Sequence, residues 1–186
     1  MTEEQLIQGC VQGNRAAQKQ LYDTCSARMY GLCCRYIKIQ ADAEDVLVTA
    51  FATIFKRIDQ YRGEGSFEGW MKRIVINEAL TFLRKNKKLS MTTSMEEIPV
   101  DVTGMTPPDS LEQEDLMQMI ESLPDGYRSV FNLYAIDGFS HREIAEKLKI
   151  SENTSKSQLS RARGFLQKLL AQTELSPKTY RHDIAS

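Results

Sequence analysis

The sequence has few of the residues from which metal sites are built. It contains two histidines and four cysteines. The cysteines all lie in the first fifth of the chain, without Cys-x-x-Cys spacing and far from either histidine (Cys10, Cys25, Cys33, Cys34; His141, His182). Zinc and redox sites need such ligands at close, regular spacing, so buried free thiols are the favoured interpretation. We therefore expect no metal and no cofactor.

The motifs of common enzyme classes are also missing. The chain has no Gly-rich phosphate loop, no zinc-protease motif and no nucleophile elbow. Carboxylate pairs do occur, at Asp42 with Asp45 and at Glu96 with Glu97. Helix capping and solvated charge explain these pairs more simply than acid–base catalysis does. The absences favour a binding protein over an enzyme.

Long apolar runs and alternating strand patterns are absent too. No apolar run approaches the roughly 20 residues that span a bilayer. The acidic opening, Met1-Thr2-Glu3-Glu4, is unlike a signal peptide. We expect a cytoplasmic protein without membrane insertion. Because helical periodicity recurs along the chain and no strand pattern does, the fold class should be all-α, with two small helical domains.

The net charge of −1 hides a strongly uneven distribution. Residues 1–89 carry 14 Lys or Arg against 10 Asp or Glu, and residues 126–172 carry 8 against 4. Between them, residues 90–125 carry no basic residue and nine acidic ones. A nucleic-acid footprint is a local property, so two basic blocks around an acidic one are compatible with DNA binding.

Capping signals and periodicity predict four helices in the first half. A capping box of Thr2 and Gln5 opens the first helix, and Asp42 is the expected N-cap of the third. The polar segment 61–66 holds two glycines and should be a loop before the fourth helix, 67–85. The inward-facing residues recur at helical spacing (Leu6, Ile7, Cys10, Val11; Leu21, Tyr22, Cys25, Met29, Leu32, Cys33, Tyr36; Val46, Phe51, Ile54, Phe55, Ile58; Trp70, Ile74, Ile76, Leu80, Leu83).

A linker is expected between the two halves. Residues 90–110 lack helical periodicity and are rich in Thr, Ser, Met, acidic residues and proline, which indicates a segment that is flexible when free. Helical periodicity returns from Leu111, and residues 124–126 are expected to form a turn before the next helix. The apolar residues of these two helices are Leu116, Met119, Ile120 and Leu123, then Val130, Phe131, Leu133, Tyr134 and Ile136.

Residues 139–170 have the pattern of a helix-turn-helix. Ser140 with Glu143 forms a second capping box, and Ser151 is the expected N-cap of a following helix. In such a pair the second helix lies in the DNA major groove. The face opposite its apolar stripe is short-chained, hydrogen-bonding and basic, which suits phosphates and base edges (Asn153, Ser157, Ser160, Arg161, Gly164, Lys168). An amphipathic surface helix with solvated charges is the alternative for this stretch alone.

Aromatic and basic residues alternate around Trp70. Tyr61 and Phe67 lie near it, among the cations Arg62, Lys72, Arg73, Arg84 and Lys85. This mixture suits single-stranded nucleic acid, since bases stack on the rings while the backbone follows the positive charge. Taken alone, however, Trp70 and Phe67 are somewhat better explained as core residues.

These motifs together resemble the extracytoplasmic-function sigma factors, promoter-specificity subunits of bacterial RNA polymerase. The resemblance runs from about residue 3 to residue 170. It is carried by Asp42-Ala43-Glu44-Asp45-Val46 with Phe51, by residues 61–74 with Asn77, and by the helix-turn-helix motifs from Leu123-Pro124 to Arg163. All of them occur in the family's order and spacing.

The resemblance implies a role for each part of the chain. Residues 1–89 would bind core polymerase and the −10 element, 90–110 would be the acidic linker, 111–172 would bind the −35 element, and the tail 173–186 has no assigned role. The linker would either thread the RNA exit channel as a mimic of nascent RNA or serve only as a tether. An anti-sigma factor is expected as a further partner, beside core RNA polymerase and promoter DNA.

Site residues follow from the same resemblance. The clamp of the largest subunit of core polymerase would be bound by Asp42, Asp45, Val46, Phe51 and Phe55. The melted −10 strand would be held by Gly65, Ser66, Phe67, Trp70, Lys72, Arg73, Asn77 and Arg84. The −35 element would be read by Asn153, Lys156, Ser157, Ser160 and Arg161. The alternative function is an autonomous helix-turn-helix regulator that binds duplex DNA without polymerase.

Two positions of the helix-turn-helix depart from the family pattern. Ser155 stands where the family usually has an apolar β-branched residue, and the angular count places it on the inner face of its helix. We expect its hydroxyl to need a local partner, such as a backbone carbonyl one turn earlier, and Ser155→Val to stabilise the second domain. Gln158 replaces a commonly basic residue, which predicts weaker non-specific attraction to phosphates.

Overall fold

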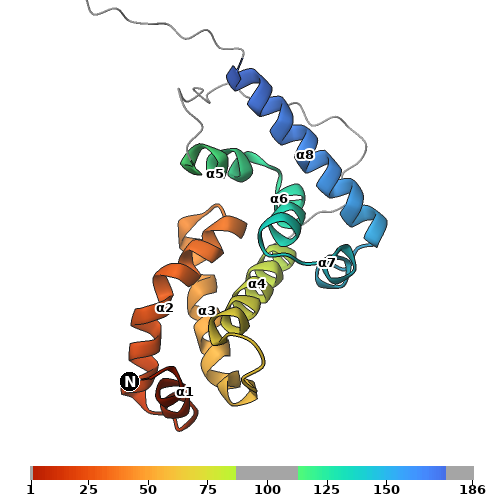
Figure 1. Ribbon diagram of the computed structural model, residues 1–186. Coiled ribbons are helices and arrows are strands. Elements are labelled where there is room, and N and C mark those ends of the chain that lie inside the picture. The colour runs from red at the N-terminus through yellow and green to blue at the C-terminus, as the bar shows by residue number, and fades with distance from the viewer. Residues whose placement is uncertain (1, 87–112, 175–186) are drawn as a thin grey trace, which may run out of the picture. The chain divides into compact units, whose positions relative to one another are not determined.

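The computed structural model describes residues 2–86 and 113–174, and its helices belong to two units, within Met1–Ser90 and Met91–Ser186. Each unit is described by itself. Within the described residues the regular structure is helical throughout, which confirms the all-α fold with two helical regions (Figure 1). The expected linker over 90–110 and residues 175–186 of the tail lie outside the described residues.

Over residues 2–86, the first unit has four α-helices and one short 3-10 turn. They are α1 (Glu3–Val11), α2 (Arg15–Tyr36), α3 (Gln40–Arg57), η1 (Ile58–Gln60) and α4 (Phe67–Lys85). The capping box of Thr2 and Gln5 is confirmed. Asn14 caps α2 by accepting the N–H groups of Ala16 and Ala17, at 2.9 and 3.2 Å. Helices α2, α3 and α4 lie side by side and enclose the core, with α1 against one end of α2 (Figure 1).

The start of α3 differs from the prediction. Asp42 is not its N-cap, because the helix already begins at Gln40 and Ile39 occupies the cap position without a side-chain hydrogen bond. Asp42 lies in the first turn instead. A carboxylate there is favourable because it faces the positive end of the helix dipole. Aspartate is favoured both at the N-cap and in the first turn of a helix, so the sequence did not separate the two positions.

The core of the first unit contains most of the expected apolar residues. Val11 and Tyr22 are exceptions, at 42% and 37% exposure, and the edge of the Tyr22 ring covers Phe51 with 4.7 Å between ring centroids. The prediction of buried thiols is confirmed for Cys10, Cys25 and Cys33, whereas Cys34 is only partly buried. Burial raises the pKa of Cys33 to about 12, so this thiol is neutral and unreactive at physiological pH.

The second unit continues with α5 (Gln113–Ser122), α6 (Asp125–Phe131), η2 (Asn132–Ile136), α7 (His141–Leu148) and α8 (Glu152–Glu174). The expected turn at 124–126 is shorter than predicted, since Pro124 is the N-cap and α6 begins at Asp125. One core cluster joins α5 to α8 (Met119, Ile120, Leu123, Ala162, Leu166, Leu169). Leu116 was expected to be part of this stripe, but it is 43% exposed.

A buried arginine fixes the corner between α5 and α6. Arg128 is 1% exposed, and its guanidinium donates to the backbone carbonyls of Glu121 and Leu123 at 3.2 and 3.3 Å. Its other terminal nitrogen lies 2.7 Å from Asp125 Oδ1. Burial lowers the pKa of Arg128, and the neighbouring Asp125 opposes this shift. The guanidinium therefore satisfies carbonyls at the C-terminal end of α5 that have no partner within the helix.

Candidate nucleic-acid interface

The loop before α4 is shaped by two glycines. Gly63 and Gly65 have φ of +76° and +80°, a left-handed conformation that other residues rarely adopt. The Tyr61 hydroxyl donates to the carbonyl of Gly65 at 2.7 Å. Ser66 then caps α4 by accepting the N–H of Gly69 at 3.0 Å. Gly65 and Ser66 are consequently held in one conformation while remaining exposed to solvent.

Three aromatic rings pack together where this loop meets α4. Phe67 and Trp70 are stacked, with 5.7 Å between centroids and 14° between planes, and Tyr61 lies against both rings. Phe67 is 2% exposed, whereas Trp70 is only partly buried. Of the two interpretations offered by the sequence, Phe67 fits a core residue, and Trp70 keeps ring surface on which a base can stack.

Four of the predicted −10 residues share one face of α4. At about 100° per residue, Trp70, Arg73, Asn77 and Arg84 lie within one stripe. Arg73, Asn77 and Arg84 are exposed. The Arg84 side chain lies along its own helix, since its Nε donates to the carbonyl of Leu80 at 3.3 Å. This stripe is aromatic at the loop end and basic further along.

Lys72 lies outside that stripe and is paired with a carboxylate. Its Nζ is 2.8 Å from Glu68 Oε1, and Glu68 Oε2 is 2.8 Å from NH1 of Arg28 on α2. The pKa of Glu68 is lowered, chiefly by the hydrogen bond from Lys72, although partial burial opposes the shift. The structure thus separates Lys72 from Arg73 and Asn77, although all three are close in sequence.

The predicted polymerase-binding residues on α3 fall on different faces. Asp45 is exposed and Asp42 is partly exposed. Val46 and Phe51, which were expected to contact the partner, are buried at 4% and 2% exposure because they pack inside the unit. Phe55 is partly buried, with its ring centroid 5.9 Å from that of Phe51. An apolar residue that the sequence analysis missed, Val48, is 62% exposed on this helix.

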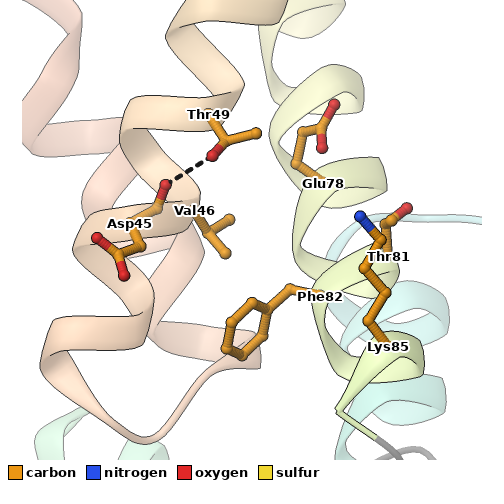
Figure 2. Close-up of a pocket in the computed structure, with 7 residues that line it drawn as sticks. All are labelled: Asp45, Val46, Thr49, Glu78, Thr81, Phe82 and Lys85. Atoms are coloured by element: carbon orange, nitrogen blue, oxygen red, sulfur yellow. Dashed lines mark hydrogen bonds between the residues drawn. The ribbon is translucent and has the colours of Figure 1, made fainter.

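A hollow lies between α3 and α4 beside Asp45. Its lining comes from both helices (Asp45, Val46, Thr49, Glu78, Thr81, Phe82, Lys85). Phe82 reaches from α4 towards Val46 on α3, and charged groups surround this apolar centre (Figure 2). Because Asp45 and Lys85 are forty residues apart in sequence, only packing of the two helices brings this lining together. No local motif signals it.

The helix-turn-helix forms as the sequence predicted. Ser140 and Glu143 make the capping box of α7. Ser151 accepts the N–H of Thr154 at 3.0 Å, as expected for the N-cap of α8. Between the helices, Lys149 adopts a left-handed conformation with φ 56° and ψ 48°, and the N–H of Ile150 bonds the carbonyl of Ala145 at 3.0 Å. A lysine therefore occupies a position where glycine is usually preferred.

The outer face of α8 is polar and basic. All five residues predicted to read the −35 element are exposed (Asn153, Lys156, Ser157, Ser160, Arg161). They lie opposite the buried stripe that includes Leu159, Ala162 and Leu166. These side chains combine short hydrogen-bonding groups with two cations, the chemistry that contacts base edges and phosphates.

The two departures from the family pattern are both buried. Ser155 is 0% exposed, as the angular count predicted, but its hydroxyl does not rely on the expected carbonyl: its Oγ lies 2.9 Å from Nδ1 of His141. The expected gain in stability from Ser155→Val is therefore revised, since valine would remove a buried hydrogen bond. Gln158 is 4% exposed. The interpretation that it tunes attraction to phosphates was wrong, because it faces the interior.

Across 2–86 and 113–174, no group of three or more His, Cys, Asp and Glu side chains is placed to hold a metal ion. Among the helices that these ranges form, none has the length and apolar character needed to cross a bilayer.

Comparisons with known proteins agree with both units. Residues 21–89 match the model of sigma-70 region 2, and residues 113–166 match that of sigma-70 region 4. The extracytoplasmic-function RNA polymerase sigma factor SigE of Mycolicibacterium smegmatis is 31% identical over 153 residues, covering 77% of this chain and 58% of that protein. The corresponding sigma-E factor of Escherichia coli is 27% identical over 175 residues, covering 88% and 91%.

A solved structure shares the fold. It is the sigma factor RpoE of Bartonella quintana in complex with the anti-sigma factor NepR, with a TM-score of 0.52 and 22% identity over 82% of this chain and 96% of that chain. The chain therefore belongs to the sigma-70 family, as one of its extracytoplasmic-function sigma factors.

Proposed function

We propose that the chain binds core RNA polymerase, directs it to promoters and helps to open the DNA strands at the start of transcription. The observation that carries this proposal is the combination of two surfaces in one chain. An aromatic and basic stripe on α4 suits an unpaired strand, and the exposed face of α8 suits duplex DNA. The role is non-enzymatic and belongs to the cytoplasm, where promoter DNA and polymerase are found.

The −10 strand is assigned to the loop and the outer stripe of α4. Gly65 and Ser66 would contact the strand at the loop, with a base stacked on Trp70. Arg73, Asn77 and Arg84 would follow the strand along the helix (with Lys72 once it leaves Glu68). Phe67 would support Trp70 from beneath, because its burial leaves little surface for direct contact. Unpairing and unstacking a base costs a few kcal/mol, and contacts with this preformed surface must offset that cost.

Core polymerase is assigned to the exposed side of α3. Asp42 and Asp45 would provide the acidic part of that surface, and Val48 beside Thr49 an apolar part. The residues predicted from the sequence as apolar contacts, Val46, Phe51 and Phe55, would act by holding α3 in place. The hollow between α3 and α4 adjoins this surface and offers Phe82 as a further contact.

The −35 element is assigned to the outer face of α8. Asn153, Lys156 and Ser157 lie in its first two turns, where a recognition helix usually contacts bases. Ser160 and Arg161 extend that face by one turn. The domain boundaries stay as proposed from the sequence, at 1–89, 90–110, 111–172 and 173–186. An anti-sigma factor is the proposed regulatory partner, as in the structure of the Bartonella quintana sigma factor.

Initiation by reconstituted polymerase tests the function. The purified chain is added to core RNA polymerase from its own organism with a library of that organism's promoters, and transcripts are sequenced from their 5′ ends. We expect new start sites that require the added chain. If the added chain binds core but directs initiation nowhere, the proposal is wrong. A free chain that binds one duplex specifically as a dimer would support the autonomous regulator instead.

One substitution tests the −10 assignment. Asn77→Ala should impair strand opening, measured by permanganate reactivity of unpaired thymines, by about tenfold if one hydrogen bond to the strand is lost. Core affinity should be unchanged, because Asn77 is on α4 and is not among the residues assigned to core polymerase. Loss of core affinity in this variant would move Asn77 to the polymerase interface. Glu64→Ala, an exposed position in the loop before α4, is the control.

A further inference from the structure

A partly buried hydrogen bond joins the two helices of the helix-turn-helix at their N-terminal ends. Ser155 belongs to the first turns of α8, and His141 is the first residue of α7. Ser155 Oγ lies 2.9 Å from His141 Nδ1, although the residues are fourteen positions apart. Ser155 is 0% exposed and His141 is partly buried, so the hydroxyl end of this contact has no access to water.

The imidazole is held on its other side by an aromatic ring. His141 stacks on Tyr134 of η2, with 4.6 Å between centroids and 22° between planes. The guanidinium of Arg163, two turns further along α8, lies 5.7 Å from the centre of the same tyrosine ring. Ser155 and Arg163 of α8 are therefore connected by a chain of side-chain contacts that includes His141 and Tyr134.

The hydroxyl has a structural reason to keep this partner. A buried hydroxyl without a hydrogen bond is costly, so nearly all buried polar groups are paired. The carbonyl one turn earlier, that of Ser151, accepts the N–H of Ser155 at 3.0 Å, and the Ser155 hydroxyl bonds the imidazole instead. His141 Nδ1 lies on a different helix. A bond from Ser155 to this nitrogen therefore connects α8 to α7, whereas a bond to the Ser151 carbonyl would stay within the N-terminal end of α8.

We infer that His141 and Ser155 form a positioning pair that sets the orientation of the DNA-reading end of α8; this inference rests on the proposed function. Lys156 and Ser157 follow Ser155 directly and point outward, so a rotation of α8 at Ser155 displaces both. Arg161 lies about 9 Å further along the helix, at 1.5 Å per residue, where the Tyr134 and Arg163 contact restrains the same rotation. His141 need not touch DNA to affect base selection.

The hydroxyl can be tested with two substitutions of equal shape. Ser155→Thr keeps Oγ, whereas Ser155→Val replaces it with a methyl group, and both add the same bulk to the buried site. Initiation by the full chain with core polymerase is compared on a promoter selected with the unmodified chain and on the same promoter with its −35 element scrambled. The measured quantity is the ratio of initiation on the intact promoter to initiation on the scrambled one. We expect this ratio to be about tenfold lower for Ser155→Val than for Ser155→Thr, equivalent to one lost base contact.

Equal ratios for the two variants would overturn the pair, whether both match the unmodified chain or both are lower. If Ser155→Val does not fold, substitutions of His141 decide instead. Asparagine keeps a polar atom near the position of Nδ1, and leucine does not. A higher ratio for His141→Asn than for His141→Leu supports the inference, and equal ratios overturn it.

A measurement on the unmodified ring does not require the Ser155→Val chain to fold. The chain has two histidines, so a His182→Gln chain gives ¹⁵N signals from the His141 imidazole alone. With the imidazole neutral, we expect Nδ1 to show the shift of a hydrogen-bonded nitrogen and to lose it in Ser155→Ala. A solvent-like Nδ1 overturns the pair. If the chain initiates transcription at no promoter, the proposed function is wrong. If initiation depends on the −35 element to the same extent in Ser155→Thr and Ser155→Val, only the positioning pair is wrong.

Discussion

Glu68 shares its two carboxylate oxygens between Lys72 Nζ and Arg28 NH1, each at 2.8 Å. The first contact occupies a cation that we assign to the promoter strand, and the second links α4 to α2. A phosphate must therefore compete with a carboxylate for Lys72. This competition should lower non-specific attraction to single strands, in which every nucleotide offers the same phosphate.

Glu68→Gln should release Lys72 to the strand. We expect tighter binding of a labelled single-stranded oligonucleotide in fluorescence anisotropy, and a plot of log affinity against log salt that is steeper by about 0.7 for the added phosphate contact. The loss of two exposed ion pairs should lower stability by no more than about 1 kcal/mol. Glu64→Gln is the matched control, since it removes one loop charge without releasing Lys72. An unchanged salt slope in Glu68→Gln would contradict the competition.

The buried thiol of Cys33 should make the chain less stable at alkaline pH. Its pKa is raised to about 12 by burial, against 9.0 for an ordinary thiol. Above about pH 9 the unfolded chain loses this proton while the folded chain keeps it, so the free energy of unfolding falls by about 1.4 kcal/mol per pH unit. Urea denaturation between pH 8 and pH 11, in roughly half-unit steps, measures the decline. Cys33→Ala should flatten it, and partly buried Cys34 provides the control, Cys34→Ala; identical slopes for all three chains would refute the assignment.

Val48 and Val46 should separate partner binding from folding. Val48 is 62% exposed and Val46 is 4% exposed on the same helix. Val48→Glu should weaken core-polymerase affinity about tenfold, the effect of a moderate interface contact, with stability within about 0.5 kcal/mol. Val46→Ala should lower the free energy of unfolding by about 2 kcal/mol and leave affinity intact below its melting temperature. Affinity titrations and thermal melts of both variants decide; the reverse pattern would restore Val46 as the contact.

Local signals were sufficient for the helices and their caps. Ser140 with Glu143 and Thr2 with Gln5 are capping boxes whose partners lie three residues apart, so the sequence contains the whole interaction. The exposed face of α8 was also predictable, because the 100° rotation per residue depends only on positions that are close in sequence. Asp42 shows the limit of this reasoning, because a first-turn carboxylate and a cap have the same local signature.

Contacts between distant residues were not predictable in this way. The bond from Ser155 to His141 spans the turn of the helix-turn-helix, and the inner position of Ser155 was foreseen while its partner was not. Val46 and Phe51 were treated as partner contacts because they stand within a family motif, yet packing against α2 and α4 buries them. A motif identifies residues that matter, but burial decides whether they act by contact or by support.

Lys149 should be the position at which the second domain is most easily stabilised. Its φ of 56° is the single positive value among non-glycine residues in the described ranges, and the left-handed conformation costs an L-residue about 1–2 kcal/mol. Glycine removes that strain but loses more backbone entropy on folding, so Lys149→Gly should gain several tenths to about 1 kcal/mol in urea denaturation. Glu146→Gly, in the exposed interior of α7, should instead lose about 1 kcal/mol. If both glycine variants are destabilised alike, the turn is not strained at Lys149.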